Sequence, residues 1–274
     1  MKPMIVRIIF LFMLCVLINV PAYATLNLKS HRATYEFDLT HVEQKSQIAD
    51  VRGEMVFEWI DDCDGWSNVQ DYSMTYFYKE GQPVYTKSDL TTWEAKDQSL
   101  YRFFVNRSTN GHVTQMIRGK AYKDDKGMTH FDYDNPKKIE FDKRANILFP
   151  SKHTFELLDR IDKGDKVFLA DFFDGGDVDG PVTLNAVYLG QENAPNFENS
   201  EIDKDLVKAQ GKHFRFSFFP IKETADAITP DYEMDLLLHE NGVVSKMKMD
   251  YNEFTLKAKL IALKSLSDTD MVCE

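Results

Sequence analysis

The sequence has 274 residues, of which 43% are hydrophobic and 13% aromatic, enough for one large domain or two small ones. Its formal net charge of −11 at pH 7 comes from 44 acidic and 33 basic residues. Because an acidic surface repels nucleic acid and anionic lipid head groups, we expect neither of these to be a partner.

The chain begins with a leader typical of exported proteins. Lys2 and Arg7 supply positive charge, residues 8–20 are nearly all apolar, and Ala22-Tyr23-Ala24 forms a small-residue cleavage site. The alternative is an uncleaved membrane anchor, but the apolar stretch is short for a membrane span. We therefore predict cleavage after Ala24, with residues 25–274 forming a single domain.

Loss of the leader removes Cys15 and leaves two cysteines, Cys63 and Cys273. An even number of cysteines in an exported protein favours a disulfide, and the alternative is two separate buried thiols. Such a bond closes a loop of about 210 residues, for which chain-entropy arithmetic gives roughly 5 kcal/mol. We expect it to hold the C-terminus, which would otherwise fray.

Alternating apolar and polar residues predict short β-strands along most of the mature chain. The first is His31–Val42, with Tyr35, Phe37 and Leu39 on one face. The regular spacing of strands and turns indicates an antiparallel meander. The further expected strands are 51–59, 72–78, Val84–Asp89, Thr91–Ala95, Leu100–Arg107, His112–Lys120, Met128–Tyr133, Lys137–Phe141, Val167–Phe172, Val182–Leu189 and Phe214–Phe218.

One segment has helical periodicity instead. In Ser151–Gly164 the residues Phe155, Leu158 and Ile161 share one helical face, and Ser151 and Gly164 are suited to cap its ends. The polar segment Glu192–Ala209 is predicted to be a long irregular loop. The alternative is that it contains a short helix within Ile202–Ala209.

The stretch Thr229–Leu266 has the clearest strand pattern. Three alternating runs follow one another, and Asn241-Gly242 between the first two suits a two-residue type I′ turn because both residues tolerate positive φ. The sequence therefore predicts a three-stranded meander with one apolar face and one charged face.

An aspartate-rich loop at 171–180 is the weak candidate for a metal site. Asp174, Asp177 and Asp179 lie among glycines, as in oxygen-rich calcium loops. The spacing is not that of an EF-hand, and a hairpin turn explains the same residues through local hydrogen bonds and positive φ. We favour the turn; if a metal binds, its hard oxygen ligands favour calcium over zinc.

No catalytic motif is visible, so we expect neither an enzyme nor a cofactor. There is no HExxH zinc motif, nucleophile elbow, P-loop or CxxC motif. A hydrolase would require a buried polar cluster that the sequence does not display. The seven histidines are scattered singly: His31, His41, His112, His130, His153, His213 and His239.

The aromatic content is the remaining functional signal, with 20 Phe, 12 Tyr and 3 Trp. Most of these side chains must fill the core between sheet and helix. The functional alternative is a concave apolar sheet face, incompletely covered by the helix, that holds an acyl chain or a partner's peptide.

Several short stretches along the mature chain form a pattern through their order and spacing. They are His31-Arg32-Ala33-Thr34-Tyr35, Gly53-Glu54-Met55-Val56-Phe57, the Cys63 region, Phe149-Pro150-Ser151-Lys152-His153-Thr154, Asp174-Gly175-Gly176-Asp177, Thr229-Pro230-Asp231-Tyr232, Glu240-Asn241-Gly242-Val243, Asp250-Tyr251, Phe254 and Cys273. In this pattern the chain resembles the cell-envelope-integrity EipB family of Gram-negative bacteria. The resemblance extends over nearly the whole mature chain, except for Glu192–Ala209.

This resemblance implies a mainly β fold: one strongly curved, spiral, barrel-like open antiparallel sheet wrapped around a single helix. It also implies a Cys63–Cys273 disulfide and a distant likeness to the lipoprotein carriers LolA and LolB. The implied role is periplasmic and non-enzymatic, supporting the envelope through a protein partner, such as one with tetratricopeptide repeats. The alternative is a carrier of a lipid or an acylated protein. The family supplies no catalytic residues.

Overall fold

The computed structural model describes residues 27–137, 139, 141–221 and 229–266. The predicted leader and Cys273 lie outside these residues, so leader cleavage and the Cys63–Cys273 bond stay predictions. No described helix is long and apolar enough to cross a membrane. The elements are β1 (His31–Val42), β2 (Ile48–Asp61), β3 (Gly65–Tyr78), β4 (Val84–Ala95), β5 (Leu100–Thr109), β6 (His112–Lys123), β7 (Met128–Asn135), β8 (Arg144–Ala145), α1 (Pro150–Asp162), β9 (Val167–Phe172), β10 (Val182–Glu192), the 3-10 helix η1 (Lys204–Val207), β11 (Gly211–Pro220), β12 (Tyr232–Leu238), β13 (Val244–Tyr251) and β14 (Phe254–Ser265).

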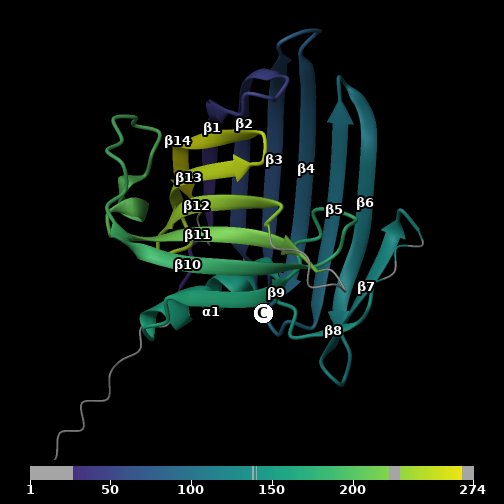
Figure 1. Cartoon of the computed structure of the whole chain (residues 1–274). Helices are drawn as coiled ribbons and strands as arrows, with labels where there is room; N and C mark the ends of the chain where they lie inside the picture. Colours follow the sequence, from purple (N-terminus) through teal and green to yellow (C-terminus); the bar gives the residue numbers. More distant parts are fainter. Residues whose placement is uncertain (1–26, 138, 140, 222–228, 267–274) are drawn as a thin grey trace, which may run out of the picture.

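The strands form one antiparallel 14-stranded sheet that is open between β8 and β9. Its order is β8-β7-β6-β5-β4-β3-β2-β1-β14-β13-β12-β11-β10-β9, so the first and last strands of the chain pair in its middle. We call β1–β8 the N-terminal half and β9–β14 the C-terminal half. Figure 1 shows the C-terminal half crossing in front of β1, β2 and β3. The expected mainly β, strongly curved sheet is confirmed.

The two edges of the sheet approach each other through one residue. The N–H of Leu148 donates to the carbonyl of Asp171 over 2.9 Å, and the N–H of Phe173 donates to the carbonyl of Leu148 over 3.1 Å. Leu148 precedes α1, and Phe173 follows β9. The sheet is therefore bent far enough to face itself, with an interior between its two halves.

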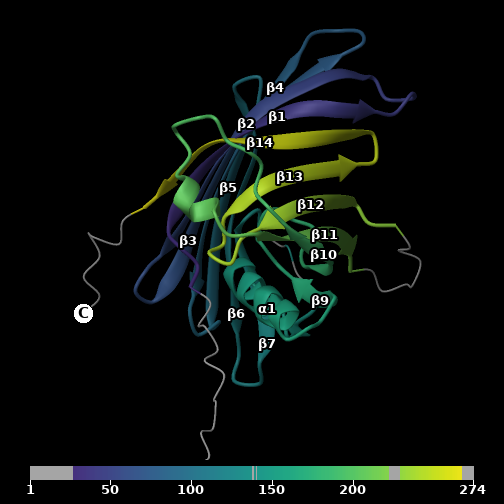
Figure 2. The ribbon, with the colours of Figure 1, turned by 90° about the vertical axis from the view of Figure 1, so that its left-hand side faces the viewer.

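Helix α1 packs into this interior. Leu157, Leu158 and Ile161 are buried at helical spacing, in one cluster with Trp59 from the N-terminal half and Phe214 from the C-terminal half. Figure 2 shows α1 beside β9 at the lower end of the molecule. The single helix is confirmed, and it links the two halves because its apolar face touches both.

The helix starts differently from the expectation. It begins at Pro150, and Phe149 is the N-cap, so the predicted cap at Ser151 is wrong. Pro suits the first helical position because its missing N–H would be unpaired there anyway. Ser151 lies inside the helix, where its hydroxyl accepts a hydrogen bond from Trp59 Nε1 over 3.1 Å.

Two strand predictions are wrong. Val84–Asp89 and Thr91–Ala95 form one strand, β4, because its register with β3 continues unbroken through Leu90. The expected strand Lys137–Phe141 is not formed by the residues described there; β7 ends at Asn135, next to Pro136, which has no N–H to donate to a ladder. The two-residue strand β8 pairs with β7 instead.

The predicted type I′ turn at Asn241-Gly242 is also wrong, because only Gly242 has positive φ there. The Asn241 side chain holds a wider turn, donating to the carbonyl of Leu206 over 2.7 Å and accepting from the N–H of Val243 over 3.2 Å. By contrast, Asn110 and Gly111 both have positive φ and join β5 to β6 in two residues.

The polar segment predicted as a loop does contain a short helix, η1. It covers one end of the core, because Ile202 and Val207 are both buried against the inner faces of β1, β13 and β14. Ile202 also forms a bridge with Leu263. The segment therefore covers the end of the core that lies beside β1 and β14, the two strands that pair in the middle of the sheet.

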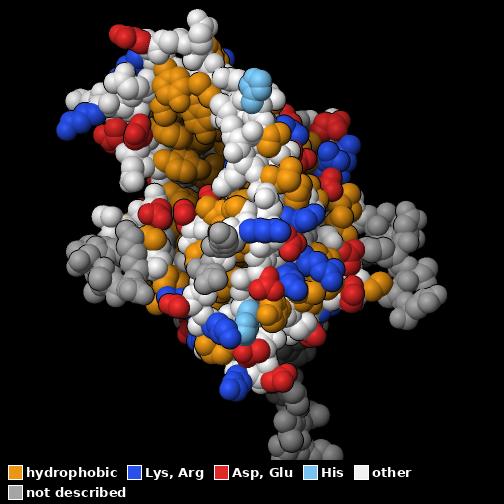
Figure 3. All heavy atoms as spheres, turned by 90° about the vertical axis from the view of Figure 1, so that its right-hand side faces the viewer, with side chains coloured by type: hydrophobic (Ala, Val, Ile, Leu, Met, Phe, Trp, Pro, Cys, Tyr) orange, Lys and Arg blue, Asp and Glu red, His pale blue; other side chains and the backbone are white. Residues whose placement is uncertain are grey.

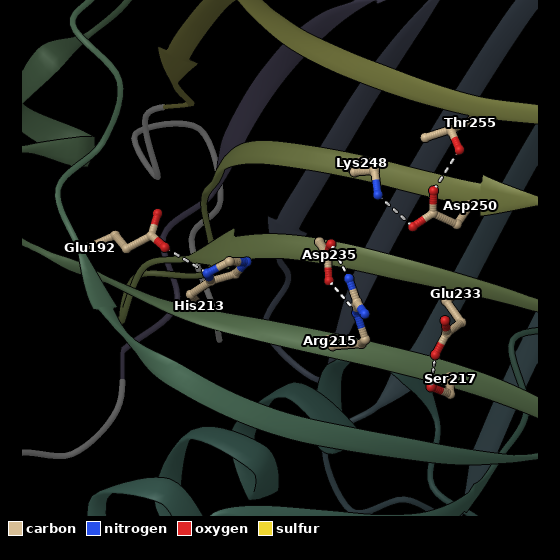
Figure 4. A network of polar contacts seen from close by, with 9 residues as sticks. All are labelled: Glu192, His213, Arg215, Ser217, Glu233, Asp235, Lys248, Asp250 and Thr255. Carbon is tan, nitrogen blue, oxygen red and sulfur yellow. Dashed lines mark hydrogen bonds and ion pairs between the residues drawn. The ribbon is translucent and has the colours of Figure 1, made fainter. Parts of the chain in front are cut away.

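The outer face of the C-terminal half carries paired polar side chains (Figure 4). Arg215 of β11 makes two 2.7 Å hydrogen bonds to Asp235 of β12, a bidentate pair that lowers the pKa of Asp235. His213 Nδ1 lies 2.7 Å from a carboxylate oxygen of Glu192. These pairs join neighbouring strands, so the charged side chains of the outer face mainly fix the register of those strands. The candidate functional side chains lie on the inner face.

Candidate functional site: a cleft between the two halves of the sheet

The aspartate-rich loop closes one end of a cleft. Gly175 and Gly180 have positive φ, and Asp174 Oδ1 accepts from the N–H of Gly176 over 2.8 Å, as expected for a turn. No three His, Cys, Asp or Glu side chains are grouped to hold a metal anywhere in the described ranges. The loop is docked by two inward tyrosines, since Tyr101 and Tyr133 donate to the carbonyls of Asp174 and Asp177.

The cleft has a volume of about 500 Å³ and lies between the inner faces of the two halves. We call it the aromatic cleft. Figure 3 shows a hollow of this kind, lined by hydrophobic side chains with charged side chains at its rim. Its lining side chains include Gln70, Tyr72, Leu90, Val105 and Arg107 from the N-terminal half, and Phe172, Phe218, Tyr232, Met249 and Tyr251 from the C-terminal half.

Stacked rings form the wall on the C-terminal side. Phe218 and Tyr232 stack with centroids 4.2 Å apart and planes 12° apart. Tyr251 lies 5.9 Å from Tyr232 and 5.0 Å from Phe254, which continues the row towards β14. Aromatic rings at these separations present a broad, rigid apolar surface.

The tyrosines of the cleft stay neutral. Burial raises the pKa of Tyr72 and of Tyr232 well above the ordinary value, and that of Tyr251 to about 12. Burial also raises the pKa of Asp174, whose carboxylate is reached by water but is crowded by the surrounding protein; Asp177 adds to this shift and Arg107 opposes it. Besides the aspartates of the loop, Arg107 and Asp231 bring ionisable side chains to the lining of the cleft.

Glu94 was not singled out from the sequence, yet it fixes the helix to the sheet. Its two carboxylate oxygens accept from the backbone N–H groups of Ser151 and Lys152, over 2.7 and 2.9 Å, and from Gln98 Nε2 over 2.7 Å. Burial raises its pKa, and these hydrogen bonds oppose the shift. A carboxylate engaged in this way caps the helix and is not a free general base.

A buried Ser–His pair was also not foreseen. His239 Nε2 and Ser245 Oγ are 2.8 Å apart, and both residues are 2% exposed. A nucleophile has to reach its substrate, and neither residue lines the aromatic cleft. Within the described chain, no carboxylate binds the other nitrogen of His239. The pair therefore stabilises the turn between β12 and β13.

The inward side chains at the start of β3 are a third group that sequence reasoning missed. The expected strand at 72–78 actually begins at Gly65, so Trp66, Asn68 and Gln70 continue the inward row of Tyr72. The period-two pattern was present in the sequence. It was overlooked because Asn68 and Gln70 are polar at positions where an apolar residue is expected.

Comparisons with known proteins agree with this architecture. The EipB-like family model matches residues 22–267. A curated relative, the cell envelope integrity protein EipB of Brucella abortus, is 26% identical over 88% of this chain and 86% of its own length. A crystal structure of a beta-barrel-like protein from a domain of unknown function, also of Brucella abortus, superposes with a TM-score of 0.80 at 28% identity, covering 88% of this chain and 99% of that one. This chain belongs to the EipB-like family.

Proposed function

We propose that this protein supports the integrity of the cell envelope from the periplasm, without catalysis, by holding an acyl chain in the aromatic cleft. Membership of the EipB-like family and the name of its curated relative support the envelope role. The observation that carries the mechanism is the row of stacked rings along a cleft of about 500 Å³.

The walls of the cleft favour an acyl chain over a peptide. They are the inner faces of a sheet, whose backbone groups are already paired between strands. A peptide lying there would bury its own N–H and C=O groups with few partners, which is unfavourable. A methylene chain has no such groups and gains from the apolar surface.

A protein partner is the second candidate, and the edge of the sheet favours it. Within the described chain, the backbone of β9 pairs with β10 on one side and is bridged on the other by Leu148, while Arg144 forms an ion pair of 3.8 Å with Asp171 there. Its outward residues Val167 and Leu169 are 55% and 64% exposed. An exposed apolar edge strand suits a partner that adds a strand, and we propose this edge for a periplasmic partner such as a tetratricopeptide-repeat protein.

Complementation of a deletion strain tests both candidates. We expect the deletion to sensitise cells to detergents and to cell-wall antibiotics. Tyr232→Lys, which places a charge in the cleft, should fail to restore resistance if acyl binding is required, whereas Leu169→Lys should fail if the edge is required. The matched controls Tyr85→Lys and Val113→Lys change exposed side chains elsewhere. An unchanged deletion strain, or full rescue by both Tyr232→Lys and Leu169→Lys, would contradict the proposal.

A further inference from the structure

A smaller cavity of about 160 Å³ lies next to the aromatic cleft, and Gln70 lines both. It is lined by inward residues of β1 to β4, by the start of α1, and by Leu28 and Gly242. Inward residues of four neighbouring strands meet here, as the pairing of His31 with Trp59 and of Trp66 with Glu94 shows.

Two buried polar atoms in its wall have no hydrogen-bond partner among the described residues. These are Nε2 of His31 and Nε1 of Trp66. His31 is 1% exposed and Trp66 is 9% exposed. Because buried polar groups are nearly always paired, two unpaired atoms in one cavity require an explanation.

The two atoms offer opposite halves of a hydrogen bond. Nδ1 of His31 lies 2.6 Å from the carbonyl oxygen of Lys29, which can only accept, so Nδ1 carries the hydrogen. Burial lowers the pKa of His31, so the ring is neutral and Nε2 is an acceptor. The indole N–H of Trp66 is a donor. The cavity thus presents one free acceptor and one free donor.

These features select the ligand by chemistry. An alkyl group would leave both atoms unpaired, and an ion would find the nearby Glu94 already engaged by the helix and Gln98. A hydroxyl group donates and accepts, so a molecule with several hydroxyls satisfies both atoms. A cavity of about 150 Å³ holds benzene, which has about six heavy atoms, and glycerol also has about six.

We propose that this cavity binds a glyceryl group, either free glycerol or the glyceryl end of an acylglycerol. The lipid source rests on the proposed function, because its acyl chain would occupy the aromatic cleft. A line of hydrogen bonds joins the two spaces: Tyr72 donates to Gln70 over 3.3 Å, and Gln70 donates to Asn68 over 3.0 Å. An acylglycerol would lie along this line with its two ends in the two spaces.

Nuclear magnetic resonance of the indole N–H groups tests the cavity directly. The chain has 3 Trp, so a ¹⁵N-labelled mature protein shows three indole signals, which Trp→Phe variants assign. We expect glycerol to move the Trp66 signal in a saturable way. The Trp93 signal should not move, because Trp93 lies on the outer face, over Gly65 and Arg102. No specific shift at Trp66 would overturn the proposal, and this measurement needs no variant to fold beyond those used for assignment.

Two ligands with a ten-carbon acyl chain, decanoate and 1-monodecanoylglycerol, distinguish free glycerol from an acylglycerol as the source of the glyceryl group. Both are used below their critical micelle concentrations. Trp66→Phe should weaken 1-monodecanoylglycerol binding by about fivefold, the effect of one lost hydrogen bond, and leave decanoate binding unchanged. Trp93→Phe is the matched control and should change neither. If only free glycerol binds, the cavity proposal stands and the acyl function fails. If decanoate binds as tightly as the ester and Trp66→Phe changes neither, the glyceryl proposal is overturned while the acyl function stands.

Discussion

Around the aromatic cleft and the small cavity, the two halves of the sheet present different inner walls to the same interior. The C-terminal half directs aromatic side chains inward, such as Phe214, Phe218 and Tyr232. The N-terminal half places Asn68 and Glu94 at equivalent inward positions. In both halves the side chains alternate between the inner and the outer face, so the fold tolerates either aromatic or polar residues at the inward positions. Polar residues that face the interior are unfavourable without partners, so Asn68 and Glu94 mark a place on the N-terminal wall where polarity is used.

Helix α1 is the element that both walls hold. From the N-terminal wall, Glu94 accepts hydrogen bonds from the first turn of the helix. From the C-terminal side, Phe168 and Phe216 surround His153, with ring centroids 5.3 and 6.0 Å away. Both sides also pack apolar side chains on the helix, and the C-terminal half adds an ion pair of 3.0 Å between the buried Lys212 and Asp162. The distinctive contributions are therefore the Glu94 carboxylate from the N-terminal wall and the rings around His153 from the C-terminal side. Four changes test this comparison.

Replacing the carboxylate that caps the helix should have the largest effect. Glu94→Gln keeps the shape but leaves one acceptor oxygen for three donors, so we expect the free energy of unfolding to fall by about 3 kcal/mol in urea denaturation. Glu156→Gln, on the exposed side of the same helix, is the matched control and should change it by less than about 0.5 kcal/mol. Equal stability of the two variants would refute the capping role.

His153, which packs against the aromatic rings of the C-terminal side, should make the free energy of unfolding depend on pH. Burial lowers its pKa from 6.5 to about 4, so the unfolded chain binds the proton more readily than the folded one. The contribution of the neutral His153 ring to the free energy of unfolding is fully present above about pH 6.5 and is lost as the pH falls towards 4. The shift corresponds to about 3 kcal/mol.

The variant His153→Phe should abolish this part of the pH dependence. Denaturation curves between pH 7 and 4 should show a smaller decline than in the wild type. Other titrating groups are common to both proteins and cancel in the difference. His41→Phe changes a histidine whose side chain is 62% exposed, and it should leave the wild-type decline in place. Parallel curves for wild type and His153→Phe would show that His153 is not the sensor.

Changing the aromatic wall should weaken ligand binding. Tyr232→Lys breaks the stack with Phe218 and brings an ammonium group into the cleft, so we expect at least about a tenfold loss of decanoate affinity in calorimetric titration. Tyr85→Lys, on the outer face, should bind as the wild type does. If Tyr232→Lys retains full affinity with its fold intact, the cleft is not the site.

Changing the polar wall should alter selectivity by a smaller amount. Gln70→Leu removes the amide between the cleft and the small cavity, which disfavours the glyceryl end of a ligand but not its chain. We expect about a threefold shift in preference from 1-monodecanoylglycerol towards decanoate, measured by competition. Gln82→Leu, in the exposed turn before β4, serves as control. A shift in binding preference towards 1-monodecanoylglycerol would contradict the proposal that the polar wall holds the glyceryl end of the ligand.

The local elements could be predicted because their signals are local. Strand alternation located most strands, and helical spacing of Leu158 and Ile161 located α1. The pairing of β1 with β14 could not be read from periodicity, since it joins residues more than 200 positions apart. Likewise, the cap of α1 comes from Glu94 on a distant strand, so the local candidate Ser151 was the wrong choice.

The candidate site was predicted only in outline. The aromatic residues were recognised as a possible concave face, and the resemblance supplied the curvature that makes them face one another. Asn68 and Gln70 were missed because polar side chains carry no core signal, although they alternate with the rest of β3. Whether a residue lies inside is decided by the bend of the whole sheet, which no short window contains.

Native mass spectrometry of the protein exported into a bacterial periplasm tests the central claim most directly. The account predicts that the wild type and Tyr85→Lys carry a stoichiometric adduct with the mass of an acylated lipid, and that Tyr232→Lys does not. Fragmentation should release a fatty acid and identify the head group. A wild-type protein without any lipid adduct, or an equal adduct on Tyr232→Lys, would contradict the acyl-binding function of the aromatic cleft.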